Sequence, residues 1–92
     1  MRKTVYVRPK HIKKGTDPVS NTACPIALAI KDAFKRDDIY MTVTHVYTGY
    51  GEDGFDRSEQ RGAALPLKAV NFQRDLFDHK KVRPFTFVLN LK

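Results

Sequence analysis

Cys24 is the one side chain in the sequence with the chemistry of a strong nucleophile. Pro25 follows it and suits the first position of a helix, because proline lacks the N–H that would be unpaired there. A thiol at a helix N-terminus ionises more readily, so Cys24 is a candidate nucleophile. The sequence does not indicate a histidine partner for Cys24, however, because His11, His45 and His79 are scattered along the chain. A small buried structural cysteine is the favoured interpretation, and no catalytic residue is assigned.

The other residues that bind metals or phosphates lack the required spacing. The three histidines, one cysteine and ten carboxylates form neither a zinc nor a calcium pattern. Gly49, Gly51 and Gly54 are not followed by the Gly-Lys-Ser/Thr of a phosphate loop, and Glu52 and Asp53 would repel a phosphate. No metal or cofactor is predicted, and the glycines indicate a hairpin tip whose role is open.

Basic side chains gather near the start, where the first fourteen residues carry six lysines and arginines and no acidic residue. The candidate residues for binding a partner or an anion are Arg8, Lys10, His11, Lys13 and Lys14. Such residues neutralise phosphates, and Tyr6 could stack on a base. The alternative is a solvated run of charge. The cluster predicts anion binding rather than sequence recognition, because the strands carry no aromatic RNA-binding motif.

The elements that carry these residues follow from hydrophobic periodicity. Thr4–Arg8 alternates, with Val5 and Val7 on one face, and predicts a strand that Pro9 ends. Residues 10–15 predict a helical turn that ends at Gly15. His11 is therefore interpreted as a structural histidine within the basic stretch.

The longest apolar, helix-favouring run extends from Cys24 to Phe34 and predicts a helix, with Asn21 and Thr22 as better capping side chains than Cys24. One face of this helix consists of Ile26, Ala27, Ile30, Ala33 and Phe34. Leu28 falls on the other side. It predicts either cover by the 17–22 loop or self-association with another copy of the chain.

The second half predicts strands and one more helix. Residues 39–48 indicate a single strand with Met41 and Val43 facing the core, followed by a turn at 49–54 and a short strand near 61–65. A second helix is expected from Pro66 to about Asp78 and a last strand over 85–91. The expected inner face of that helix consists of Ala69, Val70, Gln73, Leu76 and Phe77, with Phe72 on its flank.

This order of elements predicts an α+β fold. One-sided helices and strands with one apolar face fit a two-layer sandwich, ferredoxin-like or related, with an antiparallel or mixed sheet and two helices on one face. The 92 residues predict a single domain.

The composition limits the partners and the compartment. The net charge of +7 favours contact with a polyanion such as nucleic acid, a nucleotide, an anionic lipid surface or an acidic protein. A single cysteine cannot form an internal disulfide, which favours a reducing compartment. No apolar run approaches the about 18–20 residues that span a bilayer, so an intracellular protein without a membrane partner is expected.

Several short motifs, taken together, make the sequence similar to a known class of proteins. They are His11-Ile12-x-x-Gly15, the run from Cys24 to Ala29, Leu65-Pro66 before a helix, and Pro84-Phe85-x-Phe87. In this combination the chain resembles a class of short bacteriophage proteins of unknown function. The resemblance covers most of the length but leaves out 49–60. It carries no assigned active site, so it implies only an accessory protein that acts in the host cytoplasm.

Three functions follow in order of preference. The first is a non-enzymatic binding protein that interferes with a host or defence component, either a protein or a nucleotide signal, through the basic residues. The second is a nucleic-acid-binding module. The third is a small enzyme that uses Cys24 as its nucleophile. A homodimer is compatible with each.

Overall fold

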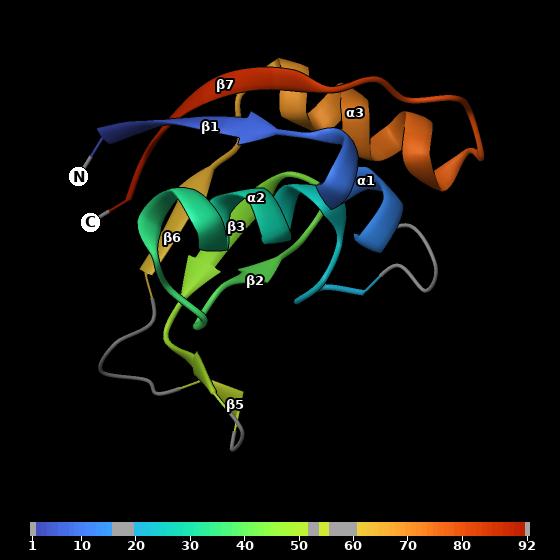
Figure 1. The fold of residues 1–92 in the computed structure, drawn as a ribbon. Helices are drawn as coiled ribbons and strands as arrows, with labels where there is room; N and C mark the ends of the chain where they lie inside the picture. Colours follow the sequence, from blue (N-terminus) through green and yellow to red (C-terminus); the bar gives the residue numbers. More distant parts are fainter. Residues whose placement is uncertain (1, 16–19, 52–53, 56–60, 92) are drawn as a thin grey trace.

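The structure is a computed structural model that describes residues 2–15, 20–51, 54–55 and 61–91. In chain order its elements are β1 (Arg2–Val7), α1 (Pro9–Gly15), α2 (Pro25–Phe34), β2 (Tyr40–Met41), β3 (His45–Thr48), β4 (Tyr50–Gly51), β5 (Gly54–Phe55), β6 (Arg61–Ala64), α3 (Leu67–Phe77) and β7 (Phe85–Asn90) (Figure 1). The α+β class expected from the sequence is confirmed.

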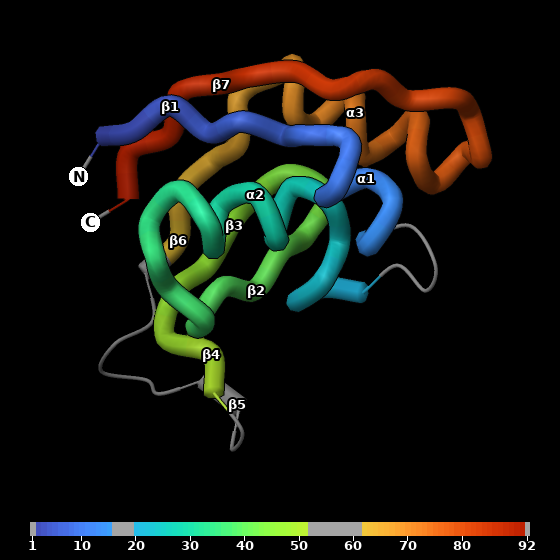
Figure 2. The backbone as a smooth tube through the Cα atoms, in the orientation of Figure 1, coloured from blue at the N-terminus to red at the C-terminus, as the bar shows by residue number. Residues whose placement is uncertain are grey.

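The first and last strands form an antiparallel pair. Arg2 lies opposite Asn90 and Val7 opposite Phe85, so the two ends of the chain run side by side (Figure 2). The buried residues Val5, Val7, Phe87 and Leu89 point inward from this pair, as the alternation predicts. The pair therefore lays one apolar face over the core, and Thr4, Tyr6 and Val88 remain on the outside.

The other strands form a second antiparallel sheet of order β2–β3–β6 and a two-stranded β4–β5 hairpin. Among the described strands, no hydrogen-bonded pairing joins β1 or β7 to the second sheet. The single sheet of a ferredoxin-like fold is therefore not confirmed. The expected hairpin is present, with Tyr50 opposite Phe55 and Gly51 opposite Gly54, while its tip at 52–53 lies outside the described residues.

The single strand expected over 39–48 is wrong, because the chain turns at 42–44. The backbone N–H of Thr42 donates to the His45 carbonyl over 2.9 Å, and the Thr42 hydroxyl accepts the His45 N–H over 3.0 Å. Threonine side chains compete with strand pairing through such local bonds. The turn changes which side chains face inward. Met41 is buried as expected, Val43 is only partly buried, and Val46 and Thr48 are buried instead.

Helix α2 places its apolar face in the core as predicted, with Ile26, Ala27 and Ile30 fully buried. Its cap differs from the expectation, because the Sγ atom of Cys24 itself accepts the Ala27 N–H over 3.4 Å. The helix packs against β1 and α1. At its other end, Lys3 of β1 donates to the Ala33 carbonyl over 3.2 Å, where a cation suits the helix dipole.

Helix α3 differs from its predicted inner face at two aromatic residues. Phe72 is buried and contacts the ring of Phe85, with ring centres 5.0 Å apart. Phe77, expected on the inner face, is 49% exposed at the last turn. Both sheets, α2 and α3 contribute side chains to one shared hydrophobic core.

Candidate functional site

Most of the predicted basic residues lie together around two adjoining hollows between β1, α1 and α2. The first has a volume of about 440 Å³ and includes Tyr6 and Arg8 in its lining, and the second, about 390 Å³, includes Lys14 and Leu28. Both hollows share Lys10, His11 and Asp32. We call this surface the basic groove and define it by Tyr6, Arg8, Lys10, His11, Lys14, Leu28 and Asp32. Lys13 is exposed and lines neither hollow.

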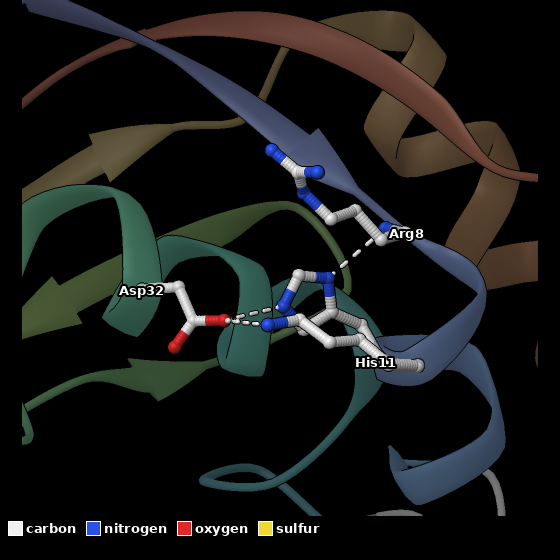
Figure 3. Close-up of polar contacts among 4 residues, drawn as sticks. Arg8, His11 and Asp32 are labelled. Atoms are coloured by element: carbon white, nitrogen blue, oxygen red, sulfur yellow. Dashed lines mark hydrogen bonds and ion pairs between the residues drawn. The ribbon is translucent and has the colours of Figure 1, made fainter.

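The floor of the basic groove is set by a reciprocal pair of hydrogen bonds at the start of α1. Pro9 ends β1 and occupies the first helical position, where its missing N–H has no consequence. The carbonyl of Arg8 accepts the His11 N–H over 2.9 Å, and the Arg8 N–H donates to His11 Nδ1 over 3.0 Å (Figure 3). His11 thus takes the role that Glu or Gln has in a capping box.

The second ring nitrogen of His11 reaches α2. Nε2 lies 2.6 Å from Oδ2 of Asp32 (Figure 3). Since Nδ1 accepts a hydrogen bond, it carries no proton, and this network assigns Nε2 as the donor to Asp32. The residue is only 4% exposed, so the prediction of a structural histidine is confirmed. With both nitrogens engaged, His11 cannot act as a general base without breaking the start of α1.

Asp32 carries the only carboxylate shared by the two hollows. The hydrogen bond from His11, and then the charge of Lys10 at 3.5 Å, hold the pKa of the Asp32 carboxyl below its usual range. The carboxylate is thus ionised at neutral pH, and Lys10 offsets its charge. Sequence reasoning missed this residue because it lies 21 positions from His11, and no local pattern connects them.

The remaining cations of the basic groove are not neutralised within the described part of the chain. The guanidinium of Arg8 lies 5.2 Å from the centre of the Tyr6 ring, in a cation–π contact. No described carboxylate forms an ion pair with Arg8 or Lys14, or with Lys13 outside the groove. Lys3, in contrast, is held at the end of α2 and near the Phe34 ring. Arg8 and Lys14 therefore leave uncompensated positive charge at the basic groove.

Helix α1 is held close to α2 by Gly15. A Cβ atom on Gly15 would lie 2.5 Å from the nitrogen of Pro25 and 2.8 Å from the carbonyl carbon of Cys24. Both atoms belong to the backbone and cannot rotate away. Glycine at this position lets the two helices meet, and so it brings Lys10 and Lys14 beside Asp32 and Leu28.

Leu28 is half-buried on the side of α2 that faces the basic groove. Its expected cover, the 17–22 loop, lies partly outside the described residues, at 17–19. Self-association through Leu28 stays a prediction.

The candidate nucleophile lies elsewhere and is enclosed. Cys24 is 2% exposed, and its Sγ accepts the Ala27 N–H and contacts Nε2 of Gln73 at 3.8 Å. Burial raises the pKa of the Cys24 thiol above its usual range, which outweighs the hydrogen bonds that lower it. The prediction of a buried structural cysteine is confirmed.

Within the described ranges, no three His, Cys, Asp or Glu side chains come together as metal ligands. None of the described helices has the length and apolarity needed to cross a membrane. No protein family model, curated protein or solved structure matches the chain.

Proposed function

We propose that the chain is a non-enzymatic accessory binding protein whose basic groove holds an anionic partner. The observation that carries this proposal is the convergence of Arg8, Lys10 and Lys14 on one surface, where, among the described residues, only Lys10 of these three cations forms an ion pair. Unpaired cations that are held close together repel one another, and an anion relieves that repulsion. The apolar side chain of Leu28 adds contact area beside the charges.

The partner proposed first is a host or defence component, either an acidic protein surface or a nucleotide signal, bound in the host cytoplasm. This context comes from the resemblance to short bacteriophage proteins, many of which act by binding. A binding role is also supported by the states of the candidate base, His11, and the candidate nucleophile, Cys24. His11 has both ring nitrogens engaged, and Cys24 is buried with a raised pKa.

Affinity capture from host lysate tests the proposal, with mass spectrometry for proteins and nucleotides together. The baits are the wild-type chain, Arg8→Glu with Lys14→Glu, and Arg74→Glu with Lys80→Glu. The last pair reverses two exposed charges outside the basic groove. We expect a specific partner on the wild-type and control baits and its loss from the groove variant. Equal capture by all three would refute the proposal.

A second candidate, a nucleic-acid-binding module, is favoured by one observation. Tyr6 is 51% exposed beside Arg8, so its ring could stack on a base while the cations contact phosphates. Four phosphate contacts by Arg8, Lys10, Lys13 and Lys14 would give a slope of log affinity against log salt of about −3 to −4. A flat salt response, or equal affinity of Tyr6→Ala and the wild type for a thymidine oligonucleotide, would remove this candidate.

A further inference from the structure

Another hollow, of about 380 Å³, lies between α3 and the segment that leads into β7. It shares no lining residue with the basic groove. We call it the α3–β7 cleft and define it by Lys68, Asn71, Phe72, Asp75, Lys81, Val82, Arg83, Pro84 and Phe85. Its volume falls in the range of about 300–1,000 Å³ that ligand pockets occupy.

The floor of the α3–β7 cleft is apolar and firmly held. Phe85 is half-buried between Phe72, with ring centres 5.0 Å apart, and Phe87, at 5.6 Å. Val82 is also partly buried against the core. Such a stack of rings keeps its shape when a ligand arrives, so an apolar side chain can enter without a large loss of order.

One row of α3 extends this apolar surface beyond the cleft. Asn71 and Asp75 line the cleft and are four residues apart, so Leu67 lies on the same row of the helix one turn earlier. Leu67 is 71% exposed, more than any other large hydrophobic side chain among the described residues. An occupant that follows this row would cover it.

The rim of the α3–β7 cleft is basic. Lys68, Lys81 and Arg83 surround it, against one carboxylate, Asp75. In the described part of the chain, none of these three cations forms an ion pair. Charge complementarity therefore calls for an acidic occupant, and the floor calls for one that carries an apolar side chain.

The mixture of donors and acceptors distinguishes a peptide from a nucleic acid. The carboxylate of Asp75 accepts hydrogen bonds, and Asn71 can both donate and accept them. A peptide backbone offers N–H donors to the carboxylate and amide, whereas the phosphodiester backbone of a nucleic acid offers none. We infer that the α3–β7 cleft is a docking site for an acidic peptide segment of a partner protein, with an aromatic or large aliphatic side chain seated on Phe72 and Phe85.

A titration of the ¹⁵N-labelled chain with a synthetic peptide of acidic residues around one central phenylalanine tests this inference. Amide shifts are expected at 68–75 and 81–85. Lys81→Glu with Arg83→Glu should weaken the peptide at least tenfold, as should replacement of its phenylalanine by serine. Arg74→Glu with Lys80→Glu reverses as many charges outside the cleft, and the affinity should change less than twofold.

The groove variant, Arg8→Glu with Lys14→Glu, separates the two sites. It should bind the peptide with wild-type affinity. The result for the basic groove and the result for the α3–β7 cleft can therefore be told apart. Shifts centred on 8–14, equal binding of the serine peptide, or tighter binding of a thymidine oligonucleotide of the same charge would each overturn it. Thermal unfolding of every variant should match the wild type, which excludes loss of binding through misfolding.

Discussion

The Nε2 atom of His11 lies 2.6 Å from Oδ2 of Asp32 and joins the first helix to the second across 21 residues of sequence. The same ring accepts the Arg8 N–H through Nδ1. One buried imidazole therefore fixes the start of α1, its position on α2 and the place where the basic groove forms. The cations around it are positioned by this contact rather than by their order in the sequence.

Replacement of Asp32 should lower stability by an amount that depends on pH, because it removes the contact with His11. The pKa of Asp32 is below its usual 3.8 when the chain is folded, so its ionised form stabilises the fold. This contribution is complete above about pH 4 and is lost as the pH falls through the lower folded pKa. Asp32→Ala should lower the free energy of unfolding by about 1 kcal/mol at pH 7, because the carboxylate is well exposed to solvent.

Urea titrations at pH 7 and near pH 2.5 would measure the effect. The difference in the free energy of unfolding between the wild type and Asp32→Ala should be smaller at the lower pH. Asp32→Asn keeps an acceptor for His11, so its free energy of unfolding at pH 7 should lie between those two values. A gap that widens on acidification would show that the carboxylate does not stabilise the fold in this way.

Gly15→Ala should separate α1 from α2. The added Cβ would meet the backbone at Cys24 and Pro25, and overpacking of this kind destabilises by about 1–3 kcal/mol. Gly51→Ala is the matched control, since a Cβ there meets nothing within 4 Å. Thermal unfolding should show a clear loss for the first variant and little change for the second. Equal melting temperatures would contradict the close approach of the two helices.

The elements and site residues that were predicted correctly are those that depend on a local pattern in the sequence. The alternation over Thr4–Arg8 and the one that starts at Phe85 identified the paired strands, and the apolar run from Cys24 to Phe34 identified α2 with its buried face. The basic residues were found because they are close in sequence. Asp32 was missed because its partner is distant, and the 39–48 strand was wrong because Thr42 closes a turn with its own hydroxyl.

Cys24 should resist modification in the folded chain. It is enclosed, and burial raises its thiol pKa, so little thiolate is available near neutral pH. A chromogenic aromatic disulfide should react at least a hundredfold more slowly with the native chain than with the chain in guanidinium. Rapid modification under native conditions would reopen the interpretation of Cys24 as a nucleophile.

Gln73 offers a test of the core beside that thiol. Its Oε1 is buried and has no hydrogen-bond partner among the described residues. An unsatisfied buried polar atom destabilises, so Gln73→Met, which has a similar shape, should raise the free energy of unfolding by about 1 kcal/mol. Gln73→Glu buries a charge and should lower the free energy of unfolding. Denaturant unfolding of the two variants would measure the expected gain and the expected loss. A loss of stability in Gln73→Met would mean that the amide is satisfied.

The central claim is that the basic groove holds an anionic partner. The most direct test is the dissociation constant of the captured partner, measured by calorimetry at physiological salt for the wild-type chain and the two charge-reversal variants. We expect at least tenfold weaker binding for Arg8→Glu with Lys14→Glu and less than a twofold change for Arg74→Glu with Lys80→Glu. Equal dissociation constants for all three chains would contradict it.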